Sequence, residues 1–304
     1  MAPVPSYSKK TLALVQSMAP EIAAAAARYG VPAEAIAGSL AQEQFDQTAS
    51  SWNEMKARLS SFNADGFLAA AYAVGRATNP SNPEQGASDF ILGRYNSDPN
   101  AITVGSDVLK KSTHPLLVDY GPAGMKFHNA IQEILKNPDD PAFKPYVKNL
   151  YSAGVALHKG SDKALMASAM AAYLRQGLEA YQSNMSINGD LKTGINSWHG
   201  LTPELQRALL VQYYKQGPTP ERVKARQEIA AQNGVPYVPQ IGVDGAGATY
   251  LANQGAITKA LADAPADFAS RWEAIPTSGS KNGSAPPIPF PGIPQLAERL
   301  ATDR

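Results

Sequence analysis

The fold is decided by the stretch Val31-Pro-Ala-Glu-Ala-Ile-Ala-Gly-Ser-Leu-Ala-Gln-Glu-Gln-Phe-Asp46. Pro32 suits the first turn of a helix, because the N–H that it lacks would have no intrahelical partner there. Ile36, Leu40 and Glu43 follow at helical spacing and therefore share one face. We expect an amphipathic helix whose apolar face ends in a carboxylate that points into the protein.

A carboxyl held against apolar side chains resists ionisation, so this placement predicts a raised pKa for Glu43. Such a group can donate a proton near neutral pH, as a general acid does. The alternative is a glutamate at the rim of the helix with a solvated head, because Glu is rarely fully buried unless it is paired. The segment alone leaves both interpretations open.

Composition limits the possible classes of protein. The 304 residues suffice for one large domain or two smaller ones, and the 44% apolar share supports a real core. The formal charge of +1 gives no basic field, so we expect no nucleic-acid partner. The chain has no cysteine, and its four histidines share no short spacing. We therefore expect no cofactor and no metal site built from histidine or cysteine.

The N-terminal region carries Lys9 and Lys10 before an apolar run. Gln16, Ser17 and Pro20 interrupt that run before the core of a signal peptide or a membrane span is complete. The sequence thus predicts no membrane insertion and no classical signal peptide. A dedicated secretion route or lysis would be needed for export.

Alanine-rich amphipathic stretches separated by Gly, Pro and Asn predict an all-α fold. Gly30 is expected to end a helix, whereas 79–86 and 96–100 are turn-rich and predict surface loops. Calcium binding at 63–66 or 188–194 is left open. A domain is expected over 1–235, followed by a C-terminal extension over 236–304 with a Pro/Gly/Ser-rich tail. The predicted helices cover about 9–29, 32–45, 50–61, 66–77, 122–136, 143–158, 161–183, 203–216 and 219–232.

Two further segments stand out. The first, Asp119-Tyr-Gly-Pro-Ala-Gly-Met-Lys-Phe-His-Asn-Ala-Ile131, begins as a glycine-bearing turn and continues into a helix. Its glycines allow a backbone to come close to a neighbour or ligand. The second, Gln212-Tyr-Tyr-Lys-Gln-Gly-Pro218, ends a helix directly after paired tyrosines. Either segment alone is compatible with plain architecture.

In this order the three segments resemble the lysozyme-like superfamily of goose-type lysozymes and soluble lytic transglycosylases. That family has a helix ending in a catalytic Glu, then a Gly-Leu-Met-Gln segment, then an Ala-Tyr-Asn-Ala-Gly-Pro segment with a substrate-facing tyrosine. The matching parts here are Ala41-Gln-Glu-Gln-Phe45, Gly121-Pro-Ala-Gly-Met-Lys126 and Gln212-Tyr-Tyr-Lys-Gln-Gly-Pro218. The approach Tyr29-Gly-Val-Pro-Ala-Glu-Ala-Ile-Ala-Gly38 is similar to the family's as well.

The chain departs from the family pattern at three points. Gln44 replaces the serine after the acid, Lys126 replaces the glutamine after the methionine, and about eighty residues separate the first two motifs. The long gap implies a helical subdomain inserted at about 48–118. Within the superfamily, the chain looks most like the muramidase effectors that bacteria inject into competitors.

The resemblance implies cleavage of the β-1,4 bond between N-acetylmuramic acid and N-acetylglucosamine, with Glu43 as the acid. A hydrolase adds a second carboxylate, for which Asp46, Glu54 and Asp119 are candidates and Asp119 is slightly preferred. Lytic transglycosylases need none, so hydrolysis and anhydro-sugar formation both stay open. The residues expected to contact the glycan strand are Gly124, Met125, Lys126, Trp198, Tyr213 and Tyr214.

The resemblance also implies a place of action and a possible protein partner. A toxin of this kind would act in the periplasm of target bacteria, and a dedicated immunity-type inhibitor could plug its site. Two alternatives belong to other classes, a non-catalytic module that binds cell wall or protein and a structural component of a phage or secretion apparatus.

Overall fold

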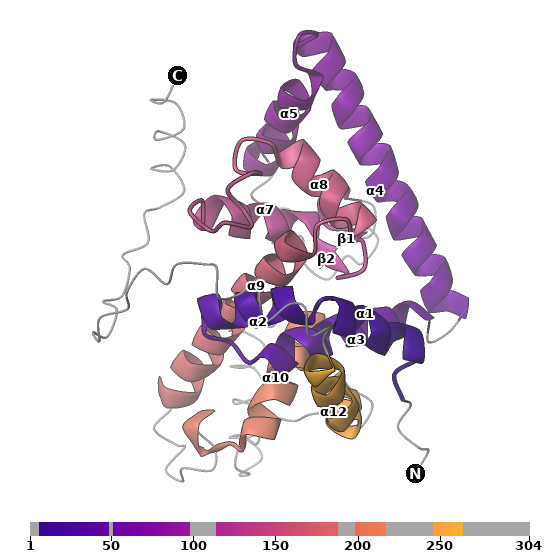
Figure 1. Ribbon diagram of the computed structural model, residues 1–304. Helices are drawn as coiled ribbons and strands as arrows, with labels where there is room; N and C mark the ends of the chain where they lie inside the picture. Colours follow the sequence, from indigo (N-terminus) through magenta and orange to yellow (C-terminus); the bar gives the residue numbers. More distant parts are fainter. Residues whose placement is uncertain (1–5, 49–50, 98–113, 188–197, 217–245, 264–304) are drawn as a thin grey trace, which may run out of the picture. The chain divides into compact units, whose positions relative to one another are not determined.

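The computed structural model describes residues 6–48, 51–97, 114–187, 198–216 and 246–263. These residues are predominantly helical, which confirms the all-α fold class (Figure 1). The chain divides into two compact units, Met1–Ala264 and Pro265–Arg304. The second unit, which contains the Pro/Gly/Ser-rich tail, lies outside the described residues, as do the predicted helix at 219–232 and the segment 188–194.

The helices are α1 (Lys9–Ser17), α2 (Ala19–Tyr29), α3 (Ala33–Thr48), α4 (Ser51–Thr78), α5 (Pro83–Ser97), α7 (Phe127–Lys136), α8 (Leu150–Lys159), α9 (Lys163–Ile187), α10 (Pro203–Gln216) and α12 (Ala246–Ala262), with a short 3-10 helix η2 (Trp198–Gly200). The strands β1 (Asp119–Tyr120) and β2 (Met125–Lys126) form one hairpin. None of the described helices has the length and apolar character that crossing a bilayer requires.

The N-terminal helix predicted over 9–29 is two helices, with the break at Met18. Pro20 lies at the start of α2, where the N–H that it lacks would have no intrahelical partner. Inside a continuous helix, the missing N–H would cost a hydrogen bond to the carbonyl group four residues earlier. The predicted stop at Gly30 is confirmed. This residue has a φ of 63° and ends α2 in the left-handed conformation that glycine adopts at low cost.

The long helix α4 corrects the prediction of separate helices at 50–61 and 66–77. It runs without a break through 63–66, so this segment is not a calcium-binding loop. Helix α5 corrects the predicted loop at 79–86, because it begins at residue 83. A Cβ on Gly86 would lie 2.9 Å from the Cα of Gly75, so the two glycines allow α4 and α5 to meet closely.

Helix α9 lies at the centre of the described fold, where it contacts α2, α3, α7, α8 and α10. Its residues 165–172 are buried without interruption. A helix that is apolar on all sides is typical of such a central position. Helices α2, α3, α7, α8 and α10 thus all pack against α9. This shared contact brings the three distinctive sequence segments near each other.

Helix α12 packs on α3 and α10, although the sequence predicts no helix after residue 235. The contact depends on Gly38 in α3, where a Cβ would lie 2.5 Å from the ring of Tyr250 and 2.9 Å from Val211. Tyr250 is fully buried there. Helix α3 is therefore enclosed by neighbours, which buries the end that carries Glu43.

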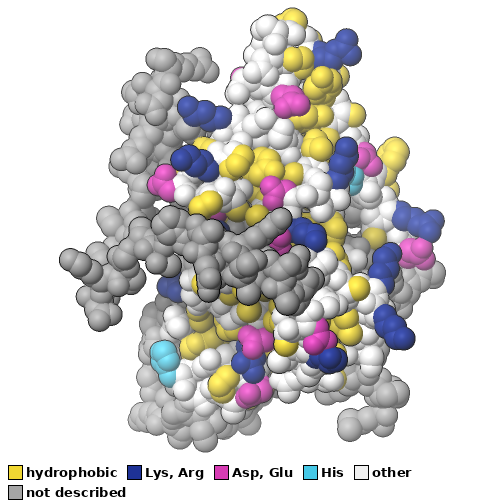
Figure 2. All heavy atoms as spheres, in the orientation of Figure 1, with side chains coloured by type: hydrophobic (Ala, Val, Ile, Leu, Met, Phe, Trp, Pro, Cys, Tyr) yellow, Lys and Arg dark blue, Asp and Glu magenta, His cyan; other side chains and the backbone are white. Residues whose placement is uncertain are grey.

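Charged side chains do not form a single-sign patch on the described part of the face shown in Figure 2, where acidic and basic groups are interspersed. This distribution agrees with the formal charge of +1. A strong electrostatic field that would attract a polyanion is therefore not seen on that face.

Candidate active site

A short β-hairpin lies where the sequence predicts the start of a helix at about 122. Asp119 pairs with Lys126 and Tyr120 with Met125 in antiparallel register, and the helix α7 begins only at Phe127. Gly121 and Gly124 frame the turn with φ values of 60° and 57°, which few residues other than glycine adopt easily. The segment is therefore a rigid turn that leads into a helix.

The two glycines let the hairpin turn fit between α8 and α3. A Cβ on Gly121 would lie 2.0 Å from the carbonyl oxygen of Leu157 in α8. A Cβ on Gly124 would lie 2.3 Å from Oε2 of Glu43 in α3. Each glycine thus has a positive φ and a neighbour that excludes any larger residue, and Gly124 presents its bare backbone to the predicted acid.

Two side chains fix this turn by hydrogen bonds to its carbonyl groups. Gln44, directly after the predicted acid, donates from Nε2 to the Pro122 oxygen at 2.8 Å. Tyr214 of α10 donates from its hydroxyl to the Ala123 oxygen at 2.8 Å. The three sequence segments therefore meet at one place, because Gln44, Tyr214 and Glu43 contact three consecutive residues of the turn.

Glu43 is 5% exposed, and Ile36 and Leu40 on the same face are fully buried. The carboxylate is thus carried inward as the spacing predicts. The Nζ of Lys215, at the end of α10, lies 3.1 Å from Glu43 Oε2 and forms an ion pair with it. Burial favours the protonated carboxyl, whereas the nearby ammonium favours the ionised one, so the two act in opposite directions.

Tyr214 is buried, and its pKa is raised well above the usual value. Burial is the main cause, and the negative charges of Glu43 and Asp119 add to it, together with an interaction with Tyr173. The hydroxyl therefore stays protonated and remains a donor to the hairpin. Tyr173 of α9 contacts both tyrosines of α10, with ring centroids 5.1 Å from Tyr213 and 5.8 Å from Tyr214.

The other predicted site residues lie in different surroundings. Asp119 forms an ion pair with Lys126 across the hairpin at 2.5 Å, and both side chains are about two fifths exposed. Met125 is buried at 3% exposure. Glu54 lies on α4, where it is 56% exposed and paired with Arg58 one turn away. These placements bring Asp119 close to the Glu43 turn and leave Glu54 in solvent.

Two candidates need separate mention. Asp46 belongs to α3, but its side chain lies outside the described residues. Trp198 is 5% exposed and stacks on Tyr181 of α9, with centroids 5.6 Å apart and planes 10° apart. Tyr181 in turn contacts Tyr213 edge-on at 6.2 Å. Trp198 is thus linked to Tyr213 through Tyr181. This placement favours a packing role for Trp198 over the predicted direct contact with a ligand.

Sequence reasoning missed Lys215 and the part played by Gln44. Lys215 follows Tyr214 inside the third segment, so a cation was visible there, but nothing local connects it with a glutamate far away in the sequence. Gln44 is counted in the sequence only as a departure from the family serine. In the structure its amide reaches the hairpin, a contact that a shorter serine could not make in the same way.

A second buried glutamate, Glu133 of α7, was also missed. It is 2% exposed and accepts a hydrogen bond from Gln176 of α9. Its pKa is raised to about 7, chiefly by burial, while Lys136 and the Gln176 hydrogen bond act to lower it and Glu179 to raise it. Its charge also raises the pKa values of Tyr173 and Tyr213.

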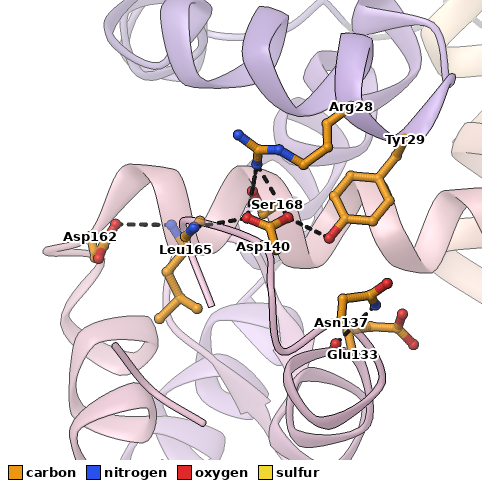
Figure 3. Close-up of polar contacts among 9 residues, drawn as sticks. Arg28, Tyr29, Glu133, Asn137, Asp140, Asp162, Leu165 and Ser168 are labelled. Atoms are coloured by element: carbon orange, nitrogen blue, oxygen red, sulfur yellow. Dashed lines mark hydrogen bonds and ion pairs between the residues drawn. The ribbon is translucent and has the colours of Figure 1, made fainter. Parts of the chain in front are cut away.

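A third buried carboxylate, Asp140, ties α2 to the region between α7 and α8. It accepts hydrogen bonds from Arg28 at 2.9 Å and from the Tyr29 hydroxyl at 2.5 Å, as Figure 3 shows. The backbone N–H of Ala142 adds a further bond at 2.8 Å. Arg28 also reaches Ser168 of α9 at 3.1 Å. This carboxylate is surrounded by donors, as expected of a structural cross-link.

Neither a family model, nor a curated protein, nor a solved structure matches this chain. The geometry around Glu43 and the resemblance of the three segments are therefore the grounds on which a function is proposed.

Proposed function

We propose that the protein is a lysozyme-like muramidase that cleaves the β-1,4 bond between N-acetylmuramic acid and N-acetylglucosamine in peptidoglycan, with Glu43 as general acid. The observation that carries the proposal is the contact of Glu43 with the bare backbone of Gly124, in a turn that accepts hydrogen bonds from Gln44 and Tyr214. A buried carboxyl beside a fixed backbone surface can hold its proton in one direction. That arrangement suits protonation of a glycosidic oxygen.

In the proposed reaction, the protonated Glu43 gives its proton to the leaving oxygen while positive charge develops on the neighbouring sugar ring. The bond between the anomeric carbon and that oxygen breaks, and Glu43 is left as a carboxylate. Water or a hydroxyl of the substrate then forms the new bond to the anomeric carbon and loses a proton, which restores the acid.

Asp119 is the favoured second carboxylate. Its charge and that of Glu43 both raise the pKa of Tyr214, which supports a common role for the two carboxylates near this side chain. Glu54 is less suitable because it is 56% exposed and paired with Arg58. Asp119 is itself paired with Lys126, so a mechanism with a single carboxylate and anhydro-sugar products is the competing form of the proposal.

The decisive experiment is digestion of purified sacculi followed by mass spectrometry of the released fragments. Reducing ends would indicate hydrolysis, and 1,6-anhydro ends would indicate transglycosylation. Glu43→Gln should abolish release, whereas Glu34→Gln, the same change in the first turn of the same helix, should not. If the wild-type protein cosedimented with sacculi but released no fragments, the enzyme proposal would be rejected in favour of a wall-binding protein.

The biological part of the proposal is that the muramidase is a bacteriolytic toxin that acts in the periplasm of competitor cells and is restrained by an inhibitor that covers Glu43 and Tyr214. Expression in a bacterial cytoplasm should be tolerated, because no wall is present there. The same chain fused to a secretion signal should lyse the host. Equal growth of the two strains, with export verified and Glu43 intact, would contradict a wall-degrading toxin.

A further inference from the structure

We infer that Glu133 of α7 is a positioning residue of the candidate active site, which in its neutral form holds α7 against α9 and thereby fixes the hairpin beside Glu43. When Glu133 ionises, it leaves this position and the hairpin loses its support. The inference rests on the proposed function and adds a regulation by pH to it. It starts from a buried carboxyl between two packed helices.

The surroundings of Glu133 suit a neutral carboxyl. Glu133 is 2% exposed, and within the described part of the chain its side-chain hydrogen-bond donor is the amide of Gln176 on α9. An amide is itself neutral, so an ionised carboxylate at this position would be buried without a bonded cation. The pKa of Glu133 is accordingly raised to about 7, with burial as the main cause.

The charged groups near this carboxyl leave it a way out to solvent. On α9, Glu179 acts to raise its pKa, and Arg175 is paired with Glu179 at 2.7 Å. On β2, Lys126 is paired with Asp119 at 2.5 Å. On α7, the exposed Lys136 acts to lower the pKa. Because residues three apart on a helix are neighbours, a carboxylate that swings outward can meet the Lys136 ammonium there.

Five aromatic rings complete the set of titratable groups around the carboxyl. Four are tyrosines, whose pKa values are raised chiefly by burial and further by the charge of Glu133, so they stay protonated in the neutral range. The fifth ring, of the buried His128 on α7, stacks on one of the tyrosines with centroids 4.8 Å apart. The tyrosines are Tyr29 on α2, Tyr95 on α5, Tyr173 on α9 and Tyr213 on α10.

Helix α7 connects Glu133 to the candidate active site. The helix begins at Phe127, directly after β2, and the fully buried Phe127 ring stacks on Tyr120 of β1 at 4.8 Å. Glu133 lies about 9 Å further along the helix axis. Because no loop separates α7 from the hairpin, a helix that loosens from α9 would also move the turn in which Gly124 lies against Glu43.

The first test compares turnover of Glu133→Gln with that of the wild type, on soluble, peptide-free glycan strands at each pH from 6 to 8. Both proteins contain Glu43 and His128, so the titration of these groups cancels in the ratio. Glutamine stays neutral, and the ratio of variant to wild type should therefore rise about tenfold over this range, as for a single group that titrates near pH 7. A constant ratio would reject the positioning role.

A second variant tests the same group from outside the core. Lys136→Gln should move the loss of activity to higher pH, because Lys136 acts to lower the pKa of Glu133. Lys159→Gln is the matched control, because it makes the same charge change at an exposed position on α8 that does not shift this pKa. Equal shifts in both lysine variants would contradict a specific effect on Glu133. Circular dichroism would verify folding, and the lysine variants carry the test if Glu133→Gln does not fold.

Hydrogen exchange gives a readout that does not depend on turnover. After correction for the intrinsic effect of pH on exchange, the amides of β2 and α7 should lose protection between pH 6 and 8 in the wild type and keep it in Glu133→Gln. Loss of protection in α7 with unchanged hairpin amides would reject the connection to the site.

The outcomes separate this inference from the proposed function. Full activity of Glu43→Gln would reject the function, whereas hydrogen exchange would still test the connection between Glu133 and the hairpin. An inactive Glu43→Gln together with a constant ratio of turnover for Glu133→Gln would reject only the role given to Glu133.

Discussion

Glu43 and Asp140 are both buried carboxylates paired with a cation that is about one third exposed, yet their surroundings differ. Asp140 receives hydrogen bonds from Arg28, Tyr29 and the backbone of Ala142, and so it is bonded on both oxygens. Glu43 is paired through Oε2 with Lys215, and the same oxygen lies against the bare backbone of Gly124. Burial is therefore common to the structural cross-link and to the proposed acid, and the contact with the Gly124 backbone is what distinguishes Glu43.

The sharpest test of this comparison removes each carboxylate. Glu43→Gln should lower turnover by on the order of a hundredfold or more, because the proton donor is lost. Its free energy of unfolding should change by about 1 kcal/mol, because glutamine fills the same space and Lys215, whose side chain is 32% exposed, is not left as a buried charge. Asp140→Ala should do the reverse, with stability lowered by about 3 kcal/mol and activity per folded molecule retained.

Kinetics on sacculi and urea unfolding of the same preparations would measure both effects. Asp263→Ala is the control for Asp140→Ala, because it breaks an exposed ion pair with Lys259 and should cost about 0.5 kcal/mol or less. The comparison would fail if Asp140→Ala lost activity as severely as Glu43→Gln while it stayed folded.

The second prediction concerns the bare backbone beside Glu43. Gly124→Ala should cost about 1–2 kcal/mol for a side chain at a φ of 57°. It should also lower turnover by more than about tenfold, because the new Cβ would lie 2.3 Å from Glu43 Oε2 and would displace it. Activity and thermal unfolding of the purified variant would test both parts.

Gly66→Ala is the matched control for this change. Gly66 lies inside α4, and a Cβ there would meet nothing within 4 Å. The substitution should therefore stabilise the protein by about 0.5–1 kcal/mol, as alanine does in a helix, with unchanged turnover. Equal turnover of Gly124→Ala and Gly66→Ala would show that the hairpin does not position Glu43.

The sequence predicts those parts of the fold that depend on residues close to one another along the chain. The inward face of Ile36, Leu40 and Glu43 follows from helical spacing, and the stop at Gly30 follows from the backbone freedom of glycine. The wrong boundaries have tertiary causes. Gly86 belongs to the segment 79–86 that is predicted as a loop, but together with Gly75 it serves the close packing of α4 on α5.

The site was predictable only in outline, for a similar reason. Strands of two residues are too short to show an alternating pattern, so the hairpin at Asp119–Tyr120 and Met125–Lys126 gave no strand signal. The partner of Glu43 is separated from it by 172 positions. Pairs of this kind are set by the packing of whole helices, which the local pattern does not contain.

The third prediction uses Glu133, whose pKa of about 7 exceeds the ordinary 4.5. Because the folded state binds this proton more tightly than the unfolded state, the contribution is fully present below about pH 4.5 and is lost as the pH rises to about 7. The loss should be on the order of 2–3 kcal/mol. Glu133→Gln should therefore unfold with a weaker dependence on pH than the wild type over this range.

Urea unfolding at intervals between pH 4.5 and 7.5 would measure that dependence for both proteins. Glu54→Gln is the control, because Glu54 is 56% exposed, is paired with Arg58, and is not among the groups that shift the pKa of Glu133, so it should leave the wild-type dependence nearly unchanged. Parallel curves for the wild type and Glu133→Gln would mean that Glu133 is ionised in the folded protein throughout, contrary to its burial.

The smallest expected effect belongs to Tyr214, the second side-chain donor to the turn. Tyr214→Phe removes the hydrogen bond to the Ala123 oxygen and leaves that carbonyl without this donor, at a cost of about 1 kcal/mol. Because the turn loses one of its two side-chain hydrogen bonds while Gln44 keeps the other, turnover should fall only a few-fold.

Tyr146→Phe is the control, because it removes a comparable hydrogen bond, to Asp162 at 2.7 Å, in the segment before α8. The two variants should unfold with similar losses of stability, but only Tyr214→Phe should lose activity. If both variants kept full turnover, the position of Glu43 would not depend on Tyr214, and the site would be fixed by α3 and Gln44 alone.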